Sequence, residues 1–250
     1  MGEAKKLIVK PIKAADANKI IKLLHYSGKI VPNSQLHFGV FNNGKCGGAM
    51  QFGPSTDKRR MLPLVRDTGW NEFMELNRMA FADWLPRNSE SRCIAYAVRF
   101  IKKIYPHIKW IVSFADGVQC GDGAIYRASG FRLIGIKKNN QILKMPDGTI
   151  NNKKTLDTPN HVAAGGRFGS ALAREQGAVA LGGFQLKYIY FIDPSARERL
   201  TVPILPFSEI DKMGARMYKG KASPASIEGD AVGDQPTEGS SILTAGLHND

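Results

Sequence analysis

The chain has 250 residues, of which 43% are hydrophobic and 23% charged, and its formal net charge of +13 favours a polyanionic partner such as nucleic acid. This composition excludes collagen-like, coiled-coil and wholly disordered proteins. No apolar run approaches the roughly 18 residues that cross a bilayer, and the N-terminus has no signal-peptide core, so we expect a cytoplasmic protein that does not enter a membrane.

The N-terminal part of the sequence predicts a strand, a helix and a hairpin. Leu7–Ile12 is an apolar run interrupted by a proline, and Ala14–Tyr26 follows with apolar residues at helical spacing. Asn42-Asn43-Gly44-Lys45 then separates two further apolar runs, at residues 36–41 and 46–52. An Asn-Gly pair at such a place predicts a tight hairpin turn, because both residues tolerate positive φ.

The middle of the sequence predicts alternating strands and helices. Phe73–Ala80 is expected to be the third strand of the sheet, and a long helix is expected to begin at Asn88 or Ser89. The elements expected after it are a strand at 109–114, a short helix at 124–129, strands at 131–136 and 186–192, and a short helix at 193–200.

These elements together predict an α+β fold with a mixed central sheet flanked by helices. Residues 1–220 are expected to form a single domain, interrupted at 151–185 by an insertion loop rich in Gly, Lys and Ala. From Lys221 the composition turns to Ser, Pro, Gly, Asp and Glu, which predicts a disordered acidic tail over 221–250. One lysine and five acidic residues give this tail a charge of −4, so residues 1–220 carry +17.

Polar residues gather where the long helix begins. Arg87, Asn88, Ser89 and Arg92 lie at its start, where backbone N–H groups are unpaired and the helix dipole is positive. This pattern predicts a site for the anionic end of a cofactor or substrate. The alternative is that the segment only caps the helix and keeps its charges in solvent.

Five other residues are candidates for chemistry. Asp116 ends an apolar strand before a glycine, which suits a general base or metal ligand but also a turn-capping Asp. His25 and Tyr26 place a near-neutral proton acceptor beside a phenol, although a His near a helix C-terminus often only complements the dipole. Tyr126 either reaches the same cleft or packs, and Arg78 in a buried strand needs a partner such as a carboxylate or phosphate.

Four segments, in this order, give the sequence a specific resemblance. They are Leu76–Met79, Pro86–Arg92, Ser113–Gly117 and Gly123–Phe131. Through them the chain resembles the Mom-type phage DNA adenine modification family, over most of residues 6–219. Members of that family are similar in fold to GCN5-related N-acetyltransferases (GNATs), so the resemblance implies a GNAT-like sheet.

The resemblance also implies an activity: conversion of adenine in double-stranded DNA to N6-carbamoylmethyladenine, which protects phage DNA from restriction in the bacterial host cytoplasm. By motif position, the catalytic residues are expected at His25, Tyr26, Arg78, Ser91, Asp116 and Tyr126. The family further implies an iron ion held by Tyr26 and Asp116. A homodimer is compatible with this interpretation.

The group donor is a small molecule that the sequence leaves unknown. Acetyl-coenzyme A or a related compound is one candidate, since Arg87 fits the first position of the acetyltransferase pyrophosphate loop. Glu90 and Arg92 replace the two small residues of that loop, however, and glutamate adds a charge that repels pyrophosphate.

A sheltered adenine amine requires that the base be flipped out of the duplex before it reacts. We expect Asp116 or His25 to deprotonate the amine, Tyr26 or Tyr126 to stack on the base, and the arginines at the helix start to hold the donor.

Two other functions stay open at this point. A GNAT acting on a small amine or a protein would share the fold, and retention of coenzyme A would support it. A non-catalytic DNA-binding protein would share the positive charge, but it leaves Arg78, Asp116 and Tyr126 unexplained.

Overall fold

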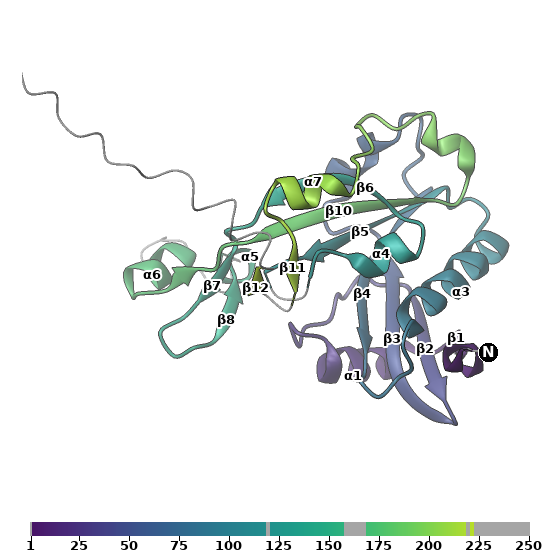
Figure 1. The fold of residues 1–250 in the computed structure, drawn as a ribbon, viewed down its shortest axis with the longest axis horizontal. Helices are drawn as coiled ribbons and strands as arrows, with labels where there is room; N and C mark the ends of the chain where they lie inside the picture. The colour runs from purple at the N-terminus through teal and green to yellow at the C-terminus, as the bar shows by residue number, and fades with distance from the viewer. Residues whose placement is uncertain (1, 119–120, 158–168, 219–220, 223–250) are drawn as a thin grey trace, which may run out of the picture.

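The computed structural model describes residues 2–118, 121–157, 169–218 and 221–222, and it consists mainly of a β-sheet with helices on both faces (Figure 1). The strands are β1 (Ile8–Pro11), β2 (Leu36–Asn42), β3 (Lys45–Gly53), β4 (Phe73–Phe81), β5 (Trp110–Asp116), β6 (Arg132–Lys138), β7 (Ile142–Lys144), β8 (Ile150–Asn152), β9 (Val179–Ala180), β10 (Phe184–Phe191), β11 (Met217–Tyr218) and β12 (Lys221–Ala222). The α-helices are α1 (Ala14–Leu24), α2 (Lys58–Met61), α3 (Ser89–Ile104), α4 (Ala124–Ala128), α5 (Lys153–Leu156), α6 (Gly169–Glu175) and α7 (Ser208–Lys212). Short 3-10 helices lie at Glu3–Lys6, Leu62–Leu64 and Pro194–Arg197.

The hairpin of β2 and β3 forms where the Asn-Gly pair predicts it. Asn43 and Gly44 adopt positive φ angles of 49° and 79°, which lets the chain reverse between the two antiparallel strands. The predicted β-α start is also confirmed, although α1 ends at Leu24 and not at Tyr26.

The central sheet has seven strands in the order β1-β2-β3-β4-β5-β10-β6. Neighbouring strands run antiparallel except β4 and β5, which are parallel, so the predicted α+β fold with a mixed sheet is confirmed. The pairing of β4 with β5 covers only Phe73–Glu75 against Trp110–Val112, although both strands continue. The two strands therefore diverge beyond Glu75 and Val112.

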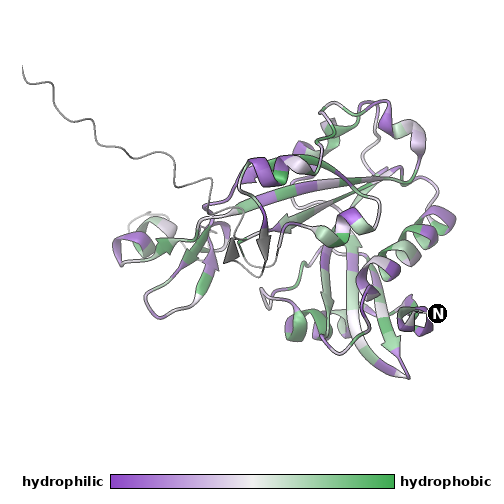
Figure 2. Cartoon of the chain, viewed as in Figure 1, coloured by the Kyte–Doolittle hydropathy of each residue, from purple (hydrophilic) through white to green (hydrophobic). Residues whose placement is uncertain are grey.

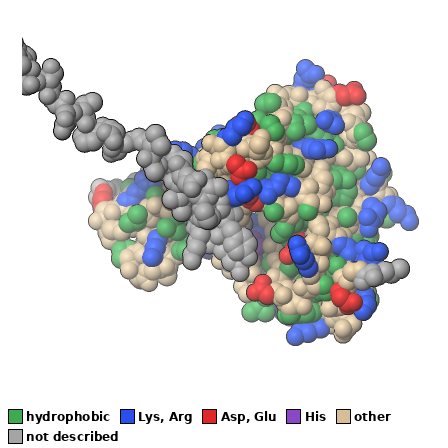
Figure 3. Space-filling model, in the orientation of Figure 1, with side chains coloured by type: hydrophobic (Ala, Val, Ile, Leu, Met, Phe, Trp, Pro, Cys, Tyr) green, Lys and Arg blue, Asp and Glu red, His purple; other side chains and the backbone are tan. Residues whose placement is uncertain are grey.

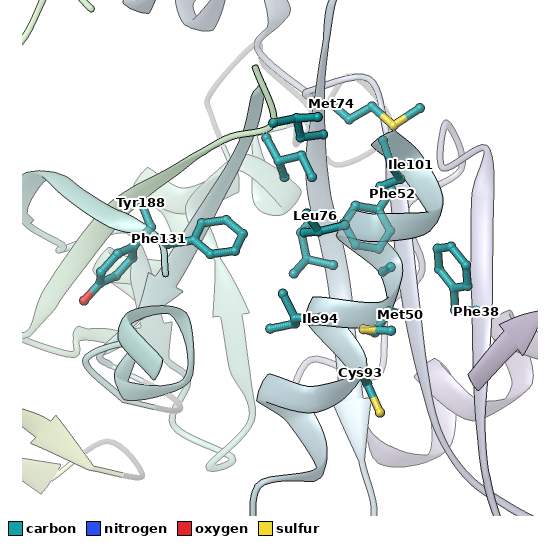
Figure 4. Packing of buried hydrophobic residues seen from close by; sticks show 14 of the residues in the cluster. Phe38, Met50, Phe52, Met74, Leu76, Cys93, Ile94, Ile101, Phe131 and Tyr188 are labelled. Atoms are coloured by element: carbon teal, nitrogen blue, oxygen red, sulfur yellow. The ribbon is translucent and has the colours of Figure 1, made fainter. Parts of the chain in front are cut away.

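One face of the sheet packs against α3. Cys93, Ile94 and Ile101 of this helix are fully buried and belong to the same apolar cluster as Met50 of β3 and Leu76 of β4 (Figure 4). Figure 2 shows how hydrophobic residues follow the strands beneath the helix. We call this side of the sheet the α3 face.

The opposite side of the sheet, which we call the α1 face, is built from strand residues that alternate with the residues of the α3 face. Ala49 precedes Met50 on β3 and therefore projects the other way, toward Ala17 and Ile21 of α1. Farther along the same face, the stacked rings of Phe73 and Trp110 begin a second cluster, with centroids 4.2 Å apart.

The described parts of residues 151–185 contain short helices and strands where the sequence predicts a loop. β8 and β9 flank β7 in a separate three-stranded sheet, and α5 and α6 lie beside it. We call this unit, residues 142–157 and 169–180, the arm; it projects from one side of the main sheet (Figure 1). Leu143, Ala173 and Ala178 form its own small core. Its described elements have two to seven residues, too few for a clear apolar period.

The predicted acidic tail falls almost entirely outside the described residues. Its first two residues, Lys221–Ala222, pair with Met217–Tyr218, whereas residues 223–250 are not described. In the parts of the chain that are described, no helix combines the length and the hydrophobicity needed to span a bilayer.

Candidate active site

A cleft of about 710 Å³ opens on the α1 face where β4 and β5 diverge. Its floor comes from β4, β5, β6 and β10, and its walls come from the segment after α1, residues 55–61 and the arm. Three of the predicted catalytic residues, Tyr26, Arg78 and Asp116, come from separate parts of the chain and line this one cleft.

A β-bulge in β4 shapes the cleft floor. Gly53 pairs with Glu75, and Gln51 pairs with Arg78. These residues are two positions apart on β3, whereas their partners are three positions apart on β4. Asn77 is inserted between them without a partner in the register, and a bulge of this kind redirects the side chains that follow it. Glu75 and Arg78 consequently line the same cleft.

Arg78 ties the floor to the segment that follows α1. Its Nε donates a hydrogen bond to the carbonyl oxygen of Lys29 at 3.2 Å, and its Nη1 donates to the carbonyl oxygen of Asn77 at 2.8 Å. The hydrogen-bond partners described for this guanidinium are therefore backbone carbonyls. The sequence had suggested a carboxylate or a phosphate instead. Arg78 is half-buried and keeps one side toward the cleft.

His25 is the residue directly after α1, and its ring does not line the cleft. Burial, reinforced by the charge of Arg78, lowers the pKa of His25 to about 4. Its Nδ1 accepts the Ser27 backbone N–H at 3.2 Å and lies 2.8 Å from Ser27 Oγ. The ring is therefore neutral near pH 7, does not complement the helix dipole, and anchors the turn that presents Tyr26.

Tyr26 lies in the cleft wall with 48% of its surface exposed, its ring centroid 4.1 Å from that of His25. In the same cleft, the Oδ1 of Asp116 accepts the Val118 backbone N–H at 3.1 Å and the Asn139 side-chain amide N–H at 3.4 Å. Asp116 thus caps its turn, as the structural alternative predicts, and also faces the cleft.

Tyr126 lies elsewhere. Its half-buried ring packs against Phe131 and Tyr188, with centroids 5.4 and 5.3 Å away, and it is not among the cleft residues. Of the two interpretations of Tyr126 that the sequence left open, the structure shows packing.

Ser91 lies at a second pocket, of about 380 Å³, near the start of α3. Arg87, Asn88 and Arg92 line this pocket together with Lys5 and Arg99, so among its described residues the charges are all positive. The predicted anion site is therefore a cationic hollow, separate in its residues from the cleft.

Two details at the start of α3 differ from the sequence expectation. Asn88 occupies the N-cap position with a left-handed φ of 68°, and its side chain makes no capping hydrogen bond. Ser89 is buried and donates its Oγ–H to the Pro86 carbonyl, so its hydroxyl does not line the pocket.

Sequence reasoning missed Glu75, which is buried with 8% of its surface exposed and lines the cleft. The signal was present in the strand pattern. Phe73 and Glu75 are two residues apart and share a face, and a carboxylate inside an apolar strand is as unusual as the arginine at 78.

The described residues do not fit an iron site. Tyr26 and Asp116 line the same cleft, but no cluster of three His, Cys, Asp or Glu side chains suited to a metal occurs in the described ranges. The Oδ1 of Asp116 already accepts two hydrogen bonds, and Arg78 adds a positive charge to the same cleft. Two oxygen ligands in cationic surroundings make a poor site for iron.

The fold and the cleft together define an α+β protein with a site between diverging strands of its sheet. The chain belongs to the Mom protein family, whose sequence profile matches residues 6–209. It is 37% identical over 203 residues to the methylcarbamoylase Mom of Escherichia phage Mu, which covers 80% of this chain and 82% of that relative. The family predicted from the four sequence motifs is confirmed.

Solved structures of acetyltransferases are similar at a greater distance. An IAA acetyltransferase from Bacillus cereus has 12% identity and a TM-score of 0.41, and the similarity covers 74% of this chain and 99% of that one. The ribosomal-protein-S18-alanine N-acetyltransferase from Escherichia coli has 11% identity and a TM-score of 0.42, and covers 75% and 94%.

Proposed function

We propose that this protein modifies adenine in double-stranded DNA, converting it to N6-carbamoylmethyladenine and so protecting phage DNA from restriction in the host cytoplasm. One observation carries the proposal: in a chain of the Mom family, Tyr26, Arg78 and Asp116 converge on one cleft from three separate segments. A non-catalytic DNA-binding protein would not require this convergence.

The charge of the cleft supports a nucleic-acid substrate. Six basic residues line it against three acidic ones: Lys29, Arg60, Arg78, Lys137, Lys154 and Lys187 against Asp57, Glu75 and Asp116. Burial, followed by the charge of Arg60, lowers the pKa of Lys187, and Lys137 contributes in the same direction. A bound phosphate would relieve this crowding of positive charge. Basic side chains are also spread over the α3 face (Figure 3).

The cleft has room for an extrahelical base. A volume of about 710 Å³ falls in the range of sites for small molecules, and the half-exposed ring of Tyr26 offers a stacking surface at its wall. His25 and Tyr126, the alternatives from the sequence, lie outside the cleft. We therefore assign stacking to Tyr26 and contact with the adenine amine to the acidic residues of the floor.

The donor of the carbamoylmethyl group would use the second pocket. Arg87, Arg92 and Lys5 surround it with positive charge, which suits the anionic end of a donor such as a coenzyme A derivative. Ser91 lies in this pocket and would contact the donor and not the base. A homodimer is compatible with this arrangement and is not required by it.

The experiment is nucleoside mass spectrometry on DNA from bacteria that express the chain, beside cells that carry the empty vector. The proposal predicts a deoxyadenosine heavier by one carbamoylmethyl group in the expressing cells alone. Unmodified DNA from cells that contain the soluble protein would contradict it. Coenzyme A retained by that purified protein would then favour an acetyltransferase of small amines or proteins.

A further inference from the structure

Glu75 is the most unusual charged group among the described residues. Its side chain lies in the floor of the cleft, 8% exposed, and its Oε2 is shielded from solvent without a hydrogen-bond partner in the described structure. Native proteins rarely leave a buried carboxylate oxygen unpaired, because the lost hydration is not replaced. A group of this kind at a ligand cleft points to a hydrogen-bond donor that arrives with the ligand.

The surroundings of Glu75 keep it in place without satisfying that oxygen. Burial raises the pKa of Glu75. This effect outweighs the lowering of the pKa by hydrogen bonds from the Ser55 and Asn77 side chains and the Thr56 backbone and by the positive charge of Arg78. Asn77 is itself fixed, since it donates to the Pro54 carbonyl at 3.2 Å and accepts from Ser34 Oγ at 3.0 Å. These groups hold the carboxylate in place, while its Oε2 has no hydrogen-bond partner among the described residues.

We propose that Glu75 is a catalytic residue, and that its Oε2 accepts the proton that the adenine N6 amine loses during modification. This inference rests on the proposed function and assigns the proton acceptor within the same cleft. Arg78, brought beside Glu75 by the bulge at Asn77, stabilises the negative charge of the carboxylate before it takes the proton. Asp116 then binds the second hydrogen of the amine.

The step balances for a donor that carries a leaving group on its carbamoylmethyl carbon. The N6 lone pair forms the new N–C bond, and the bond from that carbon to the leaving group breaks with its electron pair. One N6 proton moves to Glu75 Oε2, so the modified base leaves neutral and the carboxyl group is protonated. Solvent takes this proton when the product departs.

Burial suits Glu75 to this role better than solvent would. A general base is most effective when its pKa lies near the working pH, and the raised pKa of Glu75 moves in that direction.

The other charged or titratable groups of the cleft come from every element around it: Tyr26 and Lys29 after α1, Asp57 and Arg60 at α2, Arg78 on β4, Asp116 on β5, Lys137 on β6, Lys154 on α5 and Lys187 on β10.

The test compares Glu75→Gln with wild type and with Glu72→Gln in expressing cells. Glutamine keeps the shape of the side chain and removes its basicity. Glu72 is three residues earlier, outside the cleft, where its Oε2 accepts the Gly69 backbone N–H. We expect Glu75→Gln to slow the initial accumulation of modified deoxyadenosine by about 100-fold or more, the usual lower range for a general base, and Glu72→Gln to leave it unchanged.

Two further measurements separate catalysis from structure. If Glu75 accepts the proton, purified Glu75→Gln binds duplex DNA with wild-type affinity and unfolds at the wild-type temperature or above, because an unpaired buried charge has been removed. Modification at the wild-type rate, or slow modification together with a lower unfolding temperature, would overturn the assignment. Absence of modification by the wild type would instead overturn the proposed function itself.

Discussion

Glu75 and Arg78 lie three positions apart on one strand, yet both face the same cleft. In a regular strand, residues three apart project to opposite faces. The inserted Asn77 corrects the alternation, so that an acid and a base from one short segment meet at the point where β4 leaves β5. The bulge therefore shapes the part of the cleft floor that comes from β4.

The two hydrogen bonds of Arg78 predict that lysine cannot replace it. Arg78→Lys loses the fixed geometry that reaches the carbonyls of Lys29 and Asn77 together. We expect a loss of about 1–2 kcal/mol in the free energy of unfolding and at least a tenfold loss of modification. Urea unfolding and nucleoside mass spectrometry measure these effects. Arg132→Lys, at an exposed position at the start of β6, is the matched control, and equal effects of both changes would refute the role of Arg78.

The pKa of His25 predicts how stability changes with pH. Since its folded pKa of about 4 lies below the ordinary value of 6.5, the unfolded chain binds more protons between these values. His25 therefore makes the fold less stable as the pH falls from about 6.5 to 4, and His25→Gln should flatten that part of the profile.

The same pKa can be followed directly by NMR titration of the His25 ring. Arg78→Gln should move the pKa upward from about 4, because one cause of the lowering is removed, but short of 6.5, because burial is the larger cause. A wild-type His25 that titrates near 6.5 would contradict the buried, neutral ring.

Substituting two glycines that have nearly equal φ distinguishes backbone strain from steric overlap with a neighbouring side chain. Gly123 has φ +81° and a Cβ placed there would lie 2.5 Å from Tyr188 Cε2, whereas Gly148 has φ +84° and open space. We expect Gly148→Ala to cost about 1 kcal/mol of strain. Gly123→Ala should cost about 2–4 kcal/mol, since overpacking adds to the strain. Urea unfolding measures both, and equal losses would show that Tyr188 gives way.

The basic rim of the cleft predicts a salt-dependent affinity for DNA. If Lys154 contacts a phosphate, Lys154→Ala should lower the slope of log affinity against log salt by about 0.9. Lys103→Ala, at the far end of α3 and outside both pockets, should leave the slope unchanged. Fluorescence anisotropy with a short duplex gives both slopes, and identical behaviour of the two variants would place the DNA elsewhere.

The sequence predicted those parts of the fold whose signals are local. Apolar runs placed the strands of the main sheet, and Asn43-Gly44 placed the hairpin. The motif residues Tyr26, Arg78 and Asp116 were found through the family resemblance, and they meet in one cleft, although their roles stay predictions.

What the sequence did not predict depends on long-range pairing or on very short elements. The register between β3 and β4 creates the bulge at Asn77, and no local pattern shows such a register. The strand pattern marks Glu75 as an unusual carboxylate, but its place in the cleft depends on where β5 diverges. The arm was taken for a loop because its strands have only two or three residues.

The most direct test of adenine modification in this cleft is the yield of modified deoxyadenosine in DNA from cells expressing Asp116→Asn, beside wild type and Asp193→Asn. Asparagine can still accept the Val118 N–H, so the turn is kept while the charge in the cleft is lost. Asp193 also caps a turn, accepting the Ser195 N–H at 3.0 Å, but lies outside the cleft. We expect a yield at least tenfold lower for Asp116→Asn and an unchanged yield for Asp193→Asn. A wild-type yield from Asp116→Asn would contradict the assignment of the Asp116 carboxylate to the adenine amine.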